Sequence, residues 1–71
     1  MQQYELKVFA PKIGLTRPAP VKHSYPAPHN LAAIEHAKAV FDEDISACSW
    51  AEIHHQGDGL IWEWYAPASA E

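Results

Sequence analysis

The sequence has one cysteine, Cys48, and no hydrophobic run long enough to cross a membrane. A single cysteine excludes an intrachain disulfide framework and fits a reducing compartment, so we expect a cytoplasmic protein. A membrane-spanning helix needs ~20 consecutive apolar residues, and no segment approaches that length. Met1 to Glu5 lack the basic start and the apolar run of a signal peptide, so none is expected.

Large aliphatic side chains are also scarce. Leu, Ile, Val and Phe together supply 14 of the 71 residues, which is near the lower limit for folded proteins. Three Trp and three Tyr compensate, because each aromatic ring buries a large area. We therefore expect one small domain over residues 1–71, with roughly 60% of its surface buried on folding.

Charge is unevenly divided along the chain. The net charge is −4, yet residues 1–30 hold four cations against Glu5, and residues 31–71 hold eight acids against Lys38. Duplex DNA and anionic membranes require a basic face, so an acidic total excludes both as expected partners.

The N-terminal part predicts one clear strand and one weak strand. In residues 3–10, Tyr4, Leu6 and Val8 alternate with polar residues, as in a half-buried strand. Residues 11–28 form a Pro-rich segment that excludes helix and predicts an irregular path. Within it, residues 21–25 predict a weak edge strand that returns beside the first.

Residues 30–44 predict an amphipathic helix with Asn30 as its N-cap. We expect its apolar stripe to face the sheet; the stripe comprises Leu31, Ala33, Ile34, Ala37, Val40, Phe41 and Ile45. Asp42, Glu43 and Asp44 stand near the expected C-terminus, where acids oppose the helix macrodipole.

Residues 50–65 predict a β-hairpin that turns at Asp58-Gly59. A two-residue turn pairs His54 with Glu63, whereas a four-residue loop would set Glu52 opposite Glu63 and place like charges together. We therefore expect the two-residue turn. The expected core face holds Ala51, Ile53, His55, Leu60, Trp62 and Trp64, and the second face holds Trp50, Glu52, His54, Ile61, Glu63 and Tyr65.

These elements predict an α+β fold: a small antiparallel sheet of three to four strands with one amphipathic helix packed on one face, in β-β-α-β-β order. Phe41 and Trp62 are the expected core anchors, and residues 66–71 are an expected flexible tail. Because one helix covers only one side, the second face of the sheet is expected to be free.

Four segments carry a resemblance to known proteins: Tyr4 to Phe9, Asn30 to Ala37, Ala51 to Ile53 and Gly57 to Trp62. In pattern the chain resembles short uncharacterised bacterial proteins of β-β-α-β-β order. It departs from them in residues 11–28, where a short polar turn would be expected. The resemblance implies the fold and a bacterial or phage source, and it implies no activity.

No motif points to catalysis or to a cofactor, so we expect a protein that is not an enzyme and binds no metal. Five histidines, His23, His29, His36, His54 and His55, have no recognised zinc spacing. Cys48 is expected to be a packing residue, because nearby acids would raise a thiol pKa. Residues 57–59 predict a turn and not a phosphate loop, since no Walker lysine or helix follows.

The free sheet face favours a small acidic interaction module that binds a protein partner or forms a homodimer. The expected protein-binding residues are Trp50, Glu52, His54, Ile61, Glu63, Tyr65, Asp42, Glu43 and Asp44. In one version the three consecutive acids imitate phosphate, and the protein inhibits a nucleic-acid-binding machine. Two alternatives stay open: single-stranded nucleic-acid binding through exposed aromatics, and a metal-responsive histidine protein.

Overall fold

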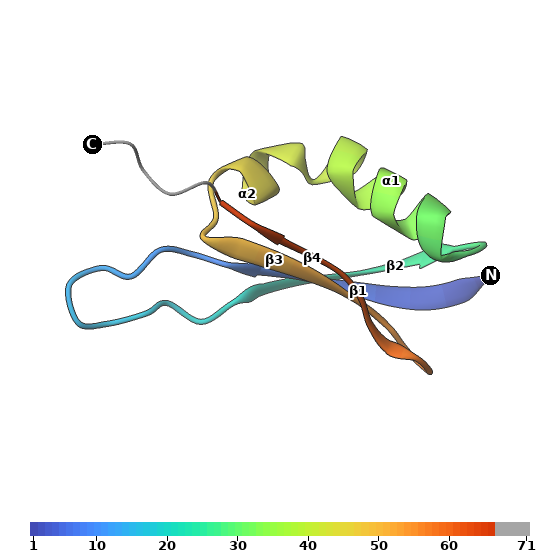
Figure 1. Cartoon of the computed structure of the whole chain (residues 1–71), viewed down its shortest axis with the longest axis horizontal. Coiled ribbons are helices and arrows are strands. Elements are labelled where there is room, and N and C mark those ends of the chain that lie inside the picture. Colours follow the sequence, from blue (N-terminus) through green and yellow to red (C-terminus); the bar gives the residue numbers. More distant parts are fainter. Residues whose placement is uncertain (67–71) are drawn as a thin grey trace.

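The protein folds as a four-stranded antiparallel sheet with two helices on one face (Figure 1). The computed structural model describes residues 1–66; the predicted tail therefore lies outside the described residues, apart from Ala66. The strands are β1 (Gln2–Phe9), β2 (Val21–Ala27), β3 (Trp50–His55) and β4 (Gly59–Tyr65), in the spatial order β2-β1-β3-β4. The predicted α+β class is confirmed, with β1 and β3 in the centre of the sheet.

The weak second strand is real and longer than expected. β2 pairs antiparallel with β1 from Val21 to Ala27, so the irregular path is confined to residues 10–20. Ile13 and Thr16 bridge this segment through two backbone hydrogen bonds of 2.8 and 3.1 Å around Gly14, whose φ of 64° suits glycine. Figure 1 shows the segment extending beyond the end of the sheet.

The predicted helix is two helices, α1 (Asn30–Val40) and α2 (Asp42–Ser46). His29, and not Asn30, caps α1, because its Nδ1 accepts the Ala32 N–H at 3.1 Å. α1 ends at Val40. The next residue, Phe41, leaves the helical conformation and stacks its ring on His23 of β2, with the ring centroids 4.3 Å apart.

The buried stripe of α1 is narrower than predicted. Ala33 and Ala37 are fully buried against the sheet, whereas Leu31 and Val40 are 61% and 60% exposed. Two alanines bring the helix close to β2, while Leu31 and Val40 point toward solvent and Ile34 packs partly against the core.

The hairpin register differs from the prediction. Ile53 pairs with Trp62 and Glu52 with Glu63, and a register shift follows at Ile53/His54. The predicted His54–Glu63 pair is therefore wrong, and the loop is wider than two residues, with Gly59 at a φ of 81°. The shift places Leu60 opposite His54 and away from the core, and it turns Ile61 inward to pack against the core.

Tyr4, Leu6 and Ile53 are the largest fully buried side chains. Phe41 and Trp62, the predicted anchors, are half-buried and pack around this centre. The core therefore rests on the two central strands, β1 and β3.

Candidate functional site

One face of the sheet is uncovered, because both helices lie against the other face (Figure 1). Side chains alternate along a strand, so the neighbours of the buried Leu6 and Ile53 point away from the helices. We call this side the open face; its members are Glu5, Lys7, Phe9, Lys22, Ser24, Trp50, Glu52, His54, Leu60, Glu63 and Tyr65.

The strand register arranges the open face in three rows that run across the strands. In the order β2, β1, β3, β4, the charged row is Lys22, Lys7, Glu52, Glu63. The aromatic row on one side of it is Phe9, Trp50, Tyr65, and the mixed row on the other side is Ser24, Glu5, His54, Leu60. The charged row thus has its two basic residues on β2 and β1 and its two acidic residues on β3 and β4.

Like charges face each other twice within the charged row. Lys7 lies opposite Lys22, and Glu52 lies opposite Glu63. Charges of one sign directly across a sheet are destabilising. Within residues 1–66, Lys22 and Glu63 form no ion pair, so each outer end of the row offers an uncompensated charge.

The two inner charges have partners on their own strands. Lys7 Nζ lies 3.9 Å from Glu5 Oε1, and His54 Nε2 lies 2.9 Å from Glu52 Oε1. The four side chains are half-buried, and pairs that are still accessible to solvent in this way are worth about 1 kcal/mol or less. These two contacts lessen the repulsion between like charges within the row, but they are too weak to hold its side chains rigidly.

The aromatic row is partly engaged within the molecule. The rings of Phe9 and Trp50 stack with centroids 4.3 Å apart, and the Arg17 guanidinium lies 4.8 Å from the Trp50 ring centre. Tyr65 is 60% exposed, and its hydroxyl donates to Glu63 Oε2 at 3.2 Å, which raises the pKa of Tyr65. The contact from Arg17 could not be predicted, because that residue belongs to the irregular segment.

A depression of about 510 Å³ lies over the mixed row. It is lined by Gln3, Tyr4, Glu5, Lys7, Ser24, His54, His55 and Gln56. Most of these residues are polar or charged, but polar and apolar atoms share its surface about equally, so the lining does not select one kind of ligand.

The predicted protein-binding residues fall on two sides of the sheet. Trp50, Glu52, His54, Glu63 and Tyr65 share the open face. Ile61 does not, because the register shift turns it toward the core. The three consecutive acids lie on the helical side, so they cannot form one surface with the others.

The sequence pattern placed those acids near a helix C-terminus, and this prediction is wrong. Asp42, Glu43 and Asp44 form the first turn of α2, where the macrodipole favours negative charge. Asp44 also holds β2, because its Oδ2 lies 3.0 Å from His23 Nε2.

The five histidines take separate positions. His23 pairs with Asp44, His29 caps α1, His36 stacks on Tyr25, His54 pairs with Glu52, and His55 holds the hairpin loop. Among residues 1–66, no three His, Cys, Asp or Glu side chains gather as a metal-binding group.

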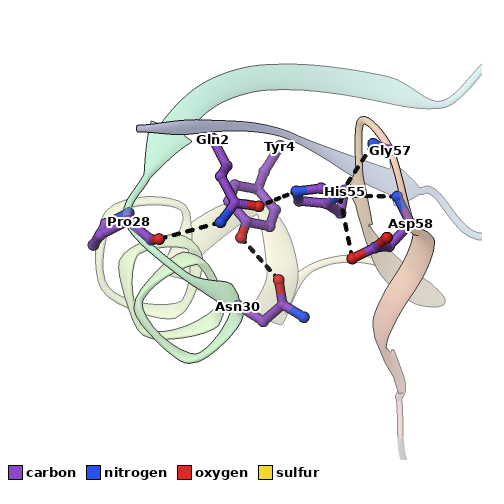
Figure 2. Close-up of polar contacts among 7 residues, drawn as sticks. All are labelled: Gln2, Tyr4, Pro28, Asn30, His55, Gly57 and Asp58. Carbon is purple, nitrogen blue, oxygen red and sulfur yellow. Dashed lines mark hydrogen bonds and ion pairs between the residues drawn. The ribbon is translucent and has the colours of Figure 1, made fainter.

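His55 is the centre of a polar network between the hairpin loop and β1 (Figure 2). Its Nδ1 accepts the N–H groups of Gly57 and Asp58 at 3.0 and 2.9 Å, and its Nε2 contacts Gln2 Oε1 on β1. Tyr4 packs edge-on against this ring and donates its hydroxyl to Asn30 Oδ1 at 2.8 Å. Asn30, the predicted helix cap, thus ties α1 to β1.

Cys48 is buried, and its thiol donates to the Ile45 carbonyl at 3.0 Å. Burial, with a smaller contribution from Asp44, raises the pKa of the Cys48 thiol. A protonated, enclosed thiol is a poor nucleophile, which supports the predicted packing role.

The described residues define a class of fold: a small α+β domain with two helices on one face of an antiparallel sheet and an open face opposite. Within residues 1–66 no helix has the length and hydrophobicity needed to span a membrane. Comparisons with family models, with curated proteins and with solved structures gave no match. The resemblance to short bacterial proteins therefore stays a prediction.

Proposed function

We propose that this protein is a small, non-enzymatic interaction module that binds a protein partner through the open face. The charged row carries this proposal, because it places Lys7 opposite Lys22 and Glu52 opposite Glu63. Each of these two like-charge pairs is unfavourable, whereas the central pair of the row, Lys7 opposite Glu52, is favourable. A partner surface with complementary charges would offset that cost on binding.

The aromatic row supports the same function. Tyr65 is 60% exposed and Trp50 is half-buried, directly beside the charged row. Aromatic anchors next to a polar rim are typical of reversible protein interfaces.

The alternatives have less support. A nucleic-acid base would have to share the Trp50 ring with Phe9 and Arg17, and Glu52 beside it repels phosphate. A metal-responsive protein would need several histidines close together, whereas the five histidines here each make a separate contact. Inhibition of a nucleic-acid-binding machine is a narrower form of our proposal, in which the acids of α2 would contact a second region of the partner.

Capture of partners from a bacterial lysate by the immobilised protein tests the proposal. We expect Trp50→Glu to abolish capture while far-UV circular dichroism shows an intact fold. Leu31→Glu is the matched control, because Leu31 is 61% exposed on the helical side. Capture that survives Trp50→Glu, or that is lost only with Leu31→Glu, would contradict binding through the open face.

A further inference from the structure

The open face is complementary to itself, and we propose that its partner is a second copy of this chain. This inference rests on the proposed function of the open face as a binding surface. The two sheets would pack face to face, related by a two-fold axis that runs along the strands between β1 and β3. Interfaces between identical chains are most often two-fold and self-complementary in this way.

The strand order determines which residues would meet. Rotation about that axis places β1 over β3 of the second copy and β2 over β4, because the order is β2-β1-β3-β4. Each row then lies over the same row of the second copy in reversed order. Sheets that pack face to face stand ~10 Å apart, within reach of two long side chains.

The charged row becomes fully complementary under this rotation. Lys7 faces Glu52 of the second copy, and Lys22 faces Glu63. Every like-charge pair within one chain thereby gains a countercharge from the other. The alternative in-plane axis, across the strands, would set Lys22 over Lys22 and Glu63 over Glu63, and is disfavoured by repulsion.

The two flanking rows agree with the same axis. In the aromatic row, Phe9 lies across from Trp50 of the second copy, so the two Phe9–Trp50 ring pairs, each with an Arg17 guanidinium over its Trp50, come together at this end of the interface. In the mixed row, Glu5 faces His54. The aromatic and mixed rows are thus compatible with the arrangement that the charged row favours.

The size of the surface sets the expected strength. Four strands spaced ~4.8 Å apart make a face about 20 Å wide, which gives an interface at the small end of the range for specific complexes. We therefore expect a reversible dimer, sensitive to salt because charged pairs contribute to it.

Sedimentation equilibrium of two single charge reversals tests the arrangement. Lys7→Glu places two acids opposite each other across the axis, and Glu52→Lys places two bases there. We expect each variant alone to dimerise roughly tenfold more weakly than wild type. An equimolar mixture should regain wild-type dimerisation, because the reversed charges then face each other. Glu43→Lys on the helical side is the control and should leave the dimer unchanged.

The outcomes separate this inference from the proposed function. Restoration in the mixture supports the face-to-face dimer, because charges within each chain are the same in the mixture as in the separate samples. A wild-type chain that stays monomeric at millimolar concentration overturns the inference, while the capture experiment still decides the proposed function. The inference is also overturned if neither charge reversal weakens the dimer, or if mixing the two variants does not restore dimerisation.

Discussion

At the scale of single residues, Tyr25 links the sheet to α1. Its hydroxyl donates to the Ala33 carbonyl at 2.8 Å, and its ring stacks on His36 with centroids 4.9 Å apart. Burial, with a smaller effect of the neighbouring Tyr4, raises the pKa of Tyr25 to about 12. The folded state therefore favours the neutral phenol.

This shift predicts a loss of stability in alkali. The folded-state pKa lies above the ordinary value of 10.0, so the stabilisation is complete below pH ~10 and is lost as the pH rises toward 12, with an upper size of about 3 kcal/mol. Urea unfolding between pH 7 and 11.5 measures it. Tyr25→Phe should cost about 1 kcal/mol at pH 7, through the lost hydrogen bond, and should flatten the alkaline decline.

Tyr65→Phe is the comparison for that series: the pKa of Tyr65 is also raised, by Glu63, but its side chain is exposed, so we expect this substitution to reduce the alkaline decline less than Tyr25→Phe does. If Tyr25→Phe and the wild type decline equally steeply, ionisation of Tyr25 is not the cause.

At the scale of elements, the β3–β4 hairpin shows how adjacent histidines act differently. His54 points to the open face and contacts Glu52, whereas His55 points to the helical side and binds the loop amides of Gly57 and Asp58. By accepting these two amides, the side chain of His55 stabilises a loop that is wider than the predicted two-residue turn. The register that follows places Glu52 opposite Glu63.

Replacing His55 should therefore loosen the loop selectively. We expect His55→Ala to speed amide exchange at Gly57 and Asp58 and to cost about 1–3 kcal/mol, because several hydrogen bonds are lost. Exchange measured by NMR checks the first effect, and urea unfolding the second. His54→Ala is the matched control on the opposite face and should leave both amides unchanged; equal effects of the two substitutions would count against this role.

At the scale of the whole molecule, stability depends on the small core between β1, β3 and α1. A domain of this size holds roughly 4–11 kcal/mol in total. Leu6 is fully buried, whereas Leu31, on the predicted apolar stripe of the helix, is 61% exposed.

The same substitution at these two leucines should have different costs. Leu6→Ala should lose ~2–5 kcal/mol through lost transfer energy and a cavity, while Leu31→Ala should change stability by no more than ~0.5 kcal/mol. The urea midpoints of the two variants measure the difference. Similar losses would show that the helix packs through Leu31, as the sequence pattern alone predicts.

Local sequence determined much of this architecture. Alternation in residues 3–10 and 50–55 and the helical period after Asn30 all depend on neighbours within a few positions, so these elements could be predicted. The uncovered second face followed from them, because a single helical layer covers only one side of a sheet. Most of the expected binding residues, including Trp50 and Tyr65, could be placed on it for that reason.

Tertiary structure decided what local patterns do not encode. The break at Phe41 depends on a ring stack with His23, which lies far away in the sequence. The hairpin loop is tied by His55 to β1, where its ring contacts Gln2 near the opposite end of the chain. The order β2-β1-β3-β4, together with the register of each strand pair, aligns Lys22, Lys7, Glu52 and Glu63 in one row. Such a row arises from pairing between strands that are distant in sequence, and therefore no periodicity within a strand could reveal it.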